Sequence, residues 1–408
     1  MIIFLRVILY GVLAVLLSVN LYIFIYKGKE KSPELNSPPP SVNVTAVAPQ
    51  AEAPLAAVGP APAPVSLPPA HEIIKTADDG SADAKNAKEY FEKGDFKKAA
   101  ELCTQLASKN KKAFLCAGLS YFKLADYENT INNLEQALDG GADEFACRKY
   151  LAFSYYYRGN FEKSLLNAEK GVAIIGDAEL KAFYSRLLRE QKAHRNFVGE
   201  STTHFTVQFD GYELGGVSRK VIAMLEDAYS TIGRDLSYYP SEPVTVILYT
   251  NQDFYDTTQV PGWMGGYFDT KDGKIRVPVR GVEGQDNLLR AVLFHEYVHS
   301  LIHSITKTCP LWIHEGLAEY YSKGPSQRVG QVIPLKYLEK SFSGLNGRGI
   351  QLAYIESHSA VSYIMDKYRA DRMKNMLVAL SSGGTLNSAF NDAFQIGYTE
   401  FTDKWGKK

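Results

Sequence analysis

The chain has 408 residues and no formal net charge, because 45 lysines and arginines balance 45 aspartates and glutamates. Its length allows two domains with additional segments. The charge balance leaves no overall field that would recruit nucleic acid or an anionic surface, so we expect no nucleic-acid partner.

Residues 1–31 predict an amino-terminal membrane anchor. Residues 7–26 form a run without a charged side chain, and a helix of that length spans about 30 Å, the thickness of a bilayer core. The bulky residues that end the run do not resemble a signal-peptidase cleavage site, which favours an uncleaved signal anchor over a signal peptide. A buried core helix is the alternative. Positive charges flank both ends of the run, so the positive-inside rule does not fix its orientation.

Residues 32–76 predict an extended linker. Proline, alanine, serine and valine dominate this segment, which includes Pro38-Pro39-Pro40, and such a composition cannot bury a core. We expect a spacer, and a proline-rich ligand is the alternative. Because the segment has the composition of an envelope spacer, we expect a single-pass membrane protein whose globular part is extracytoplasmic or periplasmic.

Residues 77–198 contain an internal repeat that predicts an all-α solenoid. An aromatic residue, a small residue, a polar residue and a second aromatic residue recur together in Tyr90…Gly94-Asp95-Phe96, Tyr121…Ala125-Asp126-Tyr127 and Tyr155…Gly159-Asn160-Phe161. The pattern resembles the tetratricopeptide repeat (TPR), two antiparallel helices joined by a turn. Residues 178–197 are expected to form a capping helix with a polar outer face. Such a solenoid can offer a groove to a partner or substrate; a rigid arm packed against the next domain is the alternative.

The four cysteines lack the spacing of a zinc knuckle. Cys103, Cys116 and Cys147 occupy small apolar positions of the repeats, so we expect them in the core. A Cys116–Cys147 disulfide in an oxidising compartment is the alternative.

Residues 199–408 predict a mixed α+β domain. The patterns predict strands over 204–209 and 244–249, a helix over 216–237, and a hairpin over 265–279 with Asp272-Gly273 as its tight turn. Pro278 predicts that the second strand of the hairpin lies at the edge of the sheet. A free edge strand could pair with an extended peptide. From Tyr354 onward the pattern is helical again.

The helix expected over residues 286–304 carries the most specific motif of the chain, His295-Glu296-Tyr297-Val298-His299. Residues four apart on a helix share a face, so both imidazoles can point at one ion, while Glu296 is rotated by about 100° and lies beside it. A catalytic zinc requires this arrangement: two imidazoles, and a carboxylate that accepts a proton from bound water. Two inert, partly buried histidines are the alternative.

A second expected helix, which follows Cys309-Pro310, supplies two further carboxylates. Zinc in hydrolases takes three protein ligands, and Glu315 offers the third. Glu319 lies one turn later, where it can accept a proton from the far ring nitrogen of a ligating histidine. That bond would fix the orientation of the ring.

The HExxH motif, followed by Trp312-Ile313-His314-Glu315-Gly316-Leu317-Ala318-Glu319-Tyr320, resembles the gluzincin metallopeptidases of the peptidase MA-like families. The resemblance covers about the last two hundred residues. It implies a zincin-type α+β domain with a small mixed sheet, acting on a peptide or protein substrate. It also implies that His295, His299 and Glu315 bind Zn²⁺, that Glu296 is the general base and that Glu319 orients a ligand. The glycine-rich exopeptidase motif of the large aminopeptidases is missing, which favours an endopeptidase.

Hydrolysis also needs a donor to the oxyanion, and gluzincins usually use a tyrosine or a histidine. Tyr354 and His358 are the first candidates, followed by Tyr320 and Tyr363, although each could be a packing residue. Four other histidines are expected to have structural or surface roles: His194, His204, His303 and His314. For His303, one turn beyond His299, competition as a ligand is the alternative.

Two other functions stay open. One is an interaction scaffold in which the repeats bind partners and the peptidase domain is vestigial. The other rests on a resemblance to envelope quality-control peptidases, which pair HExxH with TPR repeats.

Overall fold

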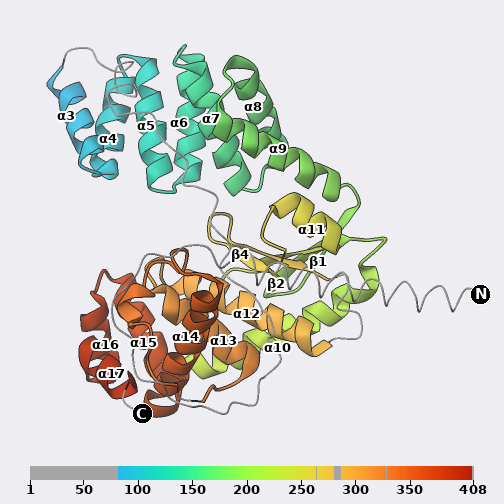
Figure 1. Cartoon of the computed structure of the whole chain (residues 1–408). Coiled ribbons are helices and arrows are strands. Elements are labelled where there is room, and N and C mark those ends of the chain that lie inside the picture. Colours follow the sequence, from blue (N-terminus) through green and yellow to red (C-terminus); the bar gives the residue numbers. More distant parts are fainter. Residues whose placement is uncertain (1–80, 263, 280–285, 328, 407–408) are drawn as a thin grey trace, which may run out of the picture. The chain divides into compact units, whose positions relative to one another are not determined.

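The computed structural model describes residues 81–262, 264–279, 286–327 and 329–406 (Figure 1). The anchor predicted over residues 1–31 and the linker predicted over 32–76 lie outside the described residues. Within the described part of the chain, no helix combines the length and the apolar run that a membrane span requires.

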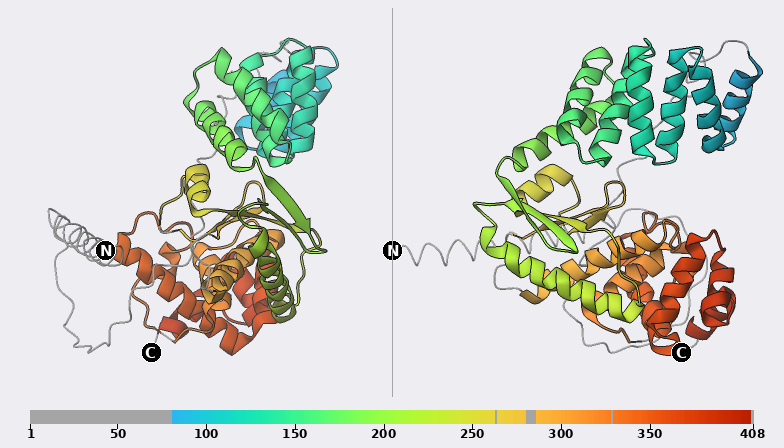
Figure 2. Two further views of the ribbon diagram at one scale, coloured as in Figure 1. Left: turned by 90° about the vertical axis from the view of Figure 1, so that its right-hand side faces the viewer. Right: turned by 180° about the vertical axis from the view of Figure 1, so that it is seen from behind.

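The repeat region folds as three helical hairpins and a further helix, which stand side by side (Figure 2). The hairpins are α3 (Ala82–Glu92) with α4 (Phe96–Ala107), α5 (Phe114–Lys123) with α6 (Tyr127–Asp139), and α7 (Glu144–Tyr157) with α8 (Phe161–Ile174). A short 3₁₀ helix, η1 (Lys111–Ala113), precedes α5, and α9 (Ala178–Ala193) follows the last hairpin. The repeat motif therefore marks helix–turn–helix units, as its spacing predicted.

The motif determines these turns through two separate roles. Its small residue adopts a positive φ, which glycine does without steric cost, and its polar residue accepts a hydrogen bond from a backbone N–H of the next helix. The small residues are Gly94, Ala125 and Gly159, and the capping residues are Asp95, Asp126 and Asn160.

The cysteine pairing differs from the expected alternative. Cys103 of α4 and Cys116 of α5 form a disulfide with Cα atoms 5.8 Å apart, whereas Cys147 of α7 is free and buried. The alternative of a Cys116–Cys147 bridge is therefore wrong, because Cys116 pairs with Cys103 of the neighbouring helix α4. All three side chains lie in the repeat core, as expected.

A five-stranded mixed sheet follows the repeats, in the order β1-β2-β3-β5-β4. Its strands are β1 (Phe197–Ser201), β2 (Phe205–Asp210), β3 (Val244–Tyr249), β4 (Tyr267–Asp269) and β5 (Lys274–Pro278). The β1–β2 and β4–β5 pairs are antiparallel, and β2–β3 and β3–β5 are parallel. We did not predict β1; it begins at Phe197 because α9 ends at Ala193, earlier than expected.

The edge of the sheet lies one strand away from its predicted position. β5 pairs with both β3 and β4, so it is an inner strand, and the edge strands are β4 and β1. Pro278 is the last residue of β5, and β4 ends its pairing at Tyr267 opposite Arg276. The missing N–H of Pro278 therefore costs no bond to β4, which is why proline is tolerated in an inner strand. The turn is also longer than predicted: four residues separate β4 from β5, and Gly273 has a φ of 67°.

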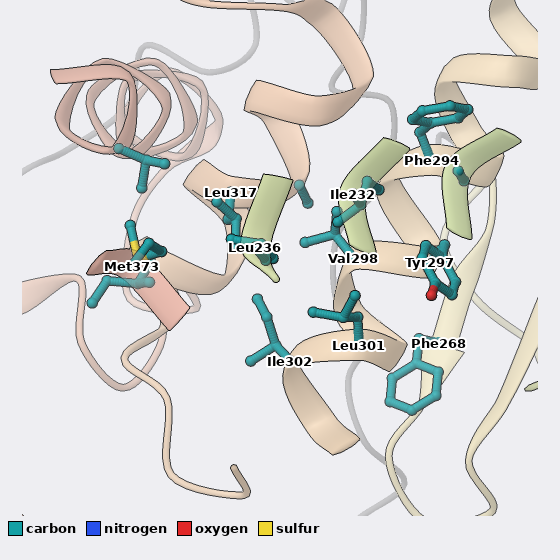
Figure 3. Close-up of a cluster of buried hydrophobic side chains, with 14 of the residues drawn as sticks. Ile232, Leu236, Phe268, Phe294, Tyr297, Val298, Leu301, Ile302, Leu317 and Met373 are labelled. Atoms are coloured by element: carbon teal, nitrogen blue, oxygen red, sulfur yellow. The ribbon is translucent and has the colours of Figure 1, made fainter. Parts of the chain in front are cut away.

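The two faces of the sheet are covered by different helices (Figure 1). α10 (Gly215–Leu236) and α12 (Asp286–Ile305) contact one face, and α11 (Asn251–Thr258) contacts the other. Figure 3 shows the main core between α10, α12 and β4, which includes Ile232, Leu236, Phe268, Tyr297, Val298 and Leu301. A smaller cluster on the opposite face joins Tyr249 and Tyr267 to α11 and to the end of α9.

The remaining elements are helical, in agreement with the pattern after Tyr354. They are α13 (Leu311–Lys323), η2 (Leu335–Tyr337), α14 (Gly347–Tyr368), α15 (Ala370–Ser381), α16 (Leu386–Phe394) and α17 (Tyr398–Gly406). α14 packs against α13, and α15 packs against α10, α12 and α14. These contacts bury α12 and α13 within one core, which positions the candidate site.

Candidate metal centre

Two buried helices bring the predicted ligands together. His295 and His299 lie on α12, and Glu315 lies in the second turn of α13, which begins directly after Pro310. The three side chains are at most 1% exposed. A glycine makes this packing possible: a Cβ at Gly316 would lie 2.3 Å from the backbone oxygen of Ser357 on α14.

One ligand atom from each of these residues lies within 4.8 Å of the others. Oε2 of Glu315 is 3.5 Å from Nε2 of His295 and 3.7 Å from Nε2 of His299. A tetrahedral zinc with bonds of about 2.1 Å would hold its ligand atoms about 3.4 Å apart. The spacing is therefore close to the one that such an ion imposes.

The surroundings of the two Nε2 atoms also fit a metal ion. Both are buried, and neither has a hydrogen-bond partner in the part of the chain that the structure describes. A buried polar atom without a partner costs about 1–3 kcal/mol. A bound divalent cation would satisfy both nitrogens at once, so the donor set fits an ion held by two imidazoles and a carboxylate.

Glu296 lies beside this point and is fully buried. Burial raises the pKa of its carboxyl to about 8; His295 lowers this pKa, and the charge of Glu315 raises it. Among the described residues, neither carboxyl oxygen has a hydrogen-bond partner in good geometry, but the backbone of Phe268 is close enough to lower this pKa. The side chain also lies close to Gly266, the residue directly before β4: a Cβ at Gly266 would lie 3.3 Å from Cγ of Glu296.

Glu319 lies near the far side of His295. Its Oε1 is 3.7 Å from Nδ1 of His295, which is close but longer than a hydrogen bond. Its Oε2 forms an ion pair with Lys323 at 2.7 Å. Glu319 thus has the position expected of an orienting acid, while one of its oxygens is shared with a lysine one turn later.

His314 is a candidate site residue that our sequence analysis assigned to a structural or surface role. Its Nδ1 is 2.6 Å from Nδ1 of His299, and the two rings stack with centroids 4.7 Å apart. Burial lowers the pKa of His314 to about 3, so its ring is neutral and can accept a hydrogen bond. If His299 binds a metal through Nε2, its Nδ1–H donates to His314. In the sequence, the signal for this role was the position of His314 directly before Glu315, because a residue next to one ligand can contact another ligand.

Residues 225–408 match the family model described as the Peptidase MA superfamily. The matched segment contains His295, Glu296, His299 and Glu315. An uncharacterized protein of Bacillus subtilis (strain 168), YhcO, is 23% identical to this chain over 208 residues, which is 45% of this chain and 63% of that protein. The chain thus covers less than two thirds of this relative. The superfamily match supports a metallopeptidase-like function for the domain, and a peptidase domain implies a peptide or protein substrate.

Within the matched segment, Tyr354 of α14 lies near the carboxylates of the cluster. Burial raises the pKa of its phenol, and the charges of Glu315, Glu319 and Glu296 raise it further. The hydroxyl therefore stays protonated and able to donate. His358, one turn later, already donates from Nε2 to the carbonyl oxygen of Gly324 at 2.7 Å.

The other two tyrosine candidates have different surroundings. The charges that raise the pKa of Tyr320 are those of Asp235 and Asp366, and Tyr363 accepts a hydrogen bond from Lys367. Tyr354 is thus the candidate whose phenol lies among the carboxylates of the cluster.

The three remaining histidines make contacts typical of packing and surface residues, as expected. His194 hydrogen-bonds the hydroxyl of Tyr249 at 2.8 Å, and His204 lies 2.7 Å from Glu226. The ring of His303 packs edge-on against Phe268.

Proposed function

We propose that the peptidase MA domain is a zinc metallopeptidase of the gluzincin type that cleaves internal peptide bonds. His295, His299 and Glu315 would hold Zn²⁺. One observation carries the proposal: ligand atoms of the three residues lie within 4.8 Å of one another, next to a carboxylate, in a domain that matches the Peptidase MA superfamily.

The chemistry needs one proton acceptor and one oxyanion donor. Bound zinc supplies Lewis acidity, which lowers the pKa of water and polarises the scissile carbonyl. Glu296 accepts the proton of the attacking water and passes it to the leaving amine when the C–N bond breaks. Its buried position beside the predicted ligands suits both roles. Tyr354 would donate a hydrogen bond to the oxyanion.

A metal-binding and turnover experiment on the purified 408-residue chain tests this function. We expect the metal-stripped chain to bind one zinc ion and to cleave an unfolded protein substrate only when zinc is restored. His295→Ala and Glu315→Ala should each lose the bound zinc and the cleavage, because two ligands do not complete the site. A wild-type chain that takes up no metal from micromolar zinc would refute the proposal.

For the rest of the chain we propose a membrane anchor and a docking region. The amino-terminal anchor would hold a single-pass protein whose globular part is extracytoplasmic, and the TPR-like repeats would dock a partner or a substrate. The alternative function is a TPR scaffold with a vestigial peptidase domain. The intact set of His295, Glu296, His299 and Glu315 argues against it, because a decayed site would be expected to have lost a ligand or the base.

A further inference from the structure

A cluster of buried charges joins the repeat region to the edge of the sheet. From the repeat region it contains Tyr156 of α7 with Arg186 and Glu190 of α9; from the β4–β5 hairpin it contains Asp269, Asp272 and Arg276. Arg276 and Glu190 are at most 2% exposed. Residues up to 120 positions apart in the sequence meet in this cluster.

The hydroxyl of Tyr156 is the common point of these contacts. It donates to Oε1 of Glu190 at 2.8 Å and accepts from Nη2 of Arg186 at 3.0 Å and from Nη2 of Arg276 at 3.1 Å. It thus connects both arginines, one from each side of the junction. Burial raises the pKa of this phenol well above its usual value, so the hydroxyl keeps the proton that it donates.

Arg276 of β5 and Arg186 of α9 each bind an aspartate of the hairpin. Arg276 donates to both carboxylate oxygens of Asp272, at 3.1 and 2.5 Å, which closes the turn between β4 and β5. Arg186 reaches Oδ2 of Asp269, the last residue of β4, at 3.4 Å. The repeat region therefore contacts the last residue of β4 through Arg186 and Arg276 of β5 through Tyr156.

The same edge strand borders the metal centre on its other face. Successive residues of a strand point to opposite faces. Phe268 packs in the main core with α12, while Tyr267 packs in the smaller cluster on the opposite face. Gly266, directly before β4, approaches Cγ of Glu296 so closely that a Cβ there would lie 3.3 Å from it. A shift of β4 would thus change the packing around the side chain of Glu296.

We propose that the repeat region holds the edge strand β4 in a fixed position beside the metal centre. Tyr156, Arg186 and Glu190 are then positioning residues for peptide hydrolysis. This role rests on the proposed function: β4 is an edge strand of the sheet, and an edge strand can pair with an extended substrate backbone. A buried ion pair adds little net stability, but it can fix one geometry. Such a cluster therefore suits a joint that must hold one strand in one place.

Two variants of the full chain test the proposal. Tyr156→Phe removes the shared hydroxyl and keeps the ring. Tyr155→Phe is the matched control: this neighbour on α7 donates to Glu135 and accepts from Lys163, both within the repeat region. Amide hydrogen exchange is measured over residues 266–276 and over the repeats, together with zinc content and the kinetics of a short peptide substrate.

We expect Tyr156→Phe to speed exchange in residues 266–276 by about tenfold, with zinc still bound. Of the three hydrogen bonds that the hydroxyl loses, one joins the repeat region to Arg276 of the hairpin. The kcat/KM for the short peptide should fall by a similar factor. Tyr155→Phe should change neither quantity. Glu190→Gln, which removes one charge of the cluster and keeps its shape, should reproduce the local rise in exchange if Tyr156→Phe fails to fold.

Three results would overturn the positioning role. The first is an exchange rate in residues 266–276 of Tyr156→Phe that equals the wild-type rate. The second is a rise in exchange that is equally large in the repeats, or equally large in Tyr155→Phe, and the third is faster exchange in β4 with an unchanged kcat/KM. A wild-type chain that binds zinc and cleaves no peptide would instead refute the proposed function. In that case, the exchange rates alone would decide whether the repeat region holds β4.

Discussion

Glu296 is the side chain on which the proposed chemistry most directly depends. Glu296→Gln keeps the shape of the side chain and all three metal ligands but removes the proton acceptor. We expect zinc to stay bound at wild-type stoichiometry while turnover falls by about 10²–10⁴-fold, measured by metal analysis and peptide hydrolysis. Glu226→Gln, the same substitution at a carboxylate that pairs with His204, should leave turnover unchanged. Wild-type turnover in Glu296→Gln would show that another group takes the proton.

His314 is expected to control how firmly His299 is held. His314→Phe keeps a stacking ring but removes the acceptor for Nδ1–H of His299, and the loss of such a partner weakens metal binding by about 10–100-fold. Competition with a chelator measures the zinc affinity. His303→Phe is the control, because His303 lies one turn beyond His299 on the same helix and packs against Phe268. If both variants bind zinc as tightly as the wild type, His314 only fills space.

At the scale of elements, the end of α9 carries a group that couples stability to pH. His194 caps this helix and hydrogen-bonds Tyr249 of β3, and burial lowers its pKa to about 4. An unfolded histidine titrates near 6.5, so between pH 6.5 and 4 the unfolded chain binds more protons than the folded one. Stability is therefore retained above pH 6.5 and falls as the pH drops towards 4, by about 3 kcal/mol for this residue.

His194→Gln keeps a polar side chain that does not titrate in this range. We expect its free energy of unfolding, measured by denaturant titration, to depend less steeply on pH between 6.5 and 5 than that of the wild type. Some dependence should remain, because burial also lowers the pKa of His303 to about 4. An identical slope in the variant and the wild type would contradict the assignment to His194.

At the scale of the whole molecule, the repeat region can act as a docking arm, as a packed support or as both. Its contacts with Tyr249 and Arg276 give it a packing role, so deleting residues 81–193 should lower the melting temperature and the turnover of a short peptide together. The reason is that the deletion exposes apolar surface and leaves Arg276 without Tyr156. A truncated chain that melts and cleaves short peptides like the wild type, with a higher KM only for a folded protein substrate, would favour docking alone.

Local patterns were sufficient wherever the relevant interaction spans only a few residues. The i, i+4 spacing of His295 and His299 on one helix places both rings on one face, and the repeat motif combines a positive-φ residue with a helix cap. The β-branched run over 244–249 became β3 with the predicted bounds. In each case, backbone geometry alone determines the outcome, so neighbouring residues carry the whole signal.

Contacts between distant segments could not be read from such patterns. β4 lies at an edge because the chain returns to place β5 beside β3, and Cys116 meets Cys103 because α4 and α5 are neighbours. The hydroxyl of Tyr156 meets Arg276 across 120 residues. These pairings depend on how whole elements pack, which many residues determine jointly, so the sequence by itself predicted the candidate ligands while the folded chain decided what surrounds and holds them.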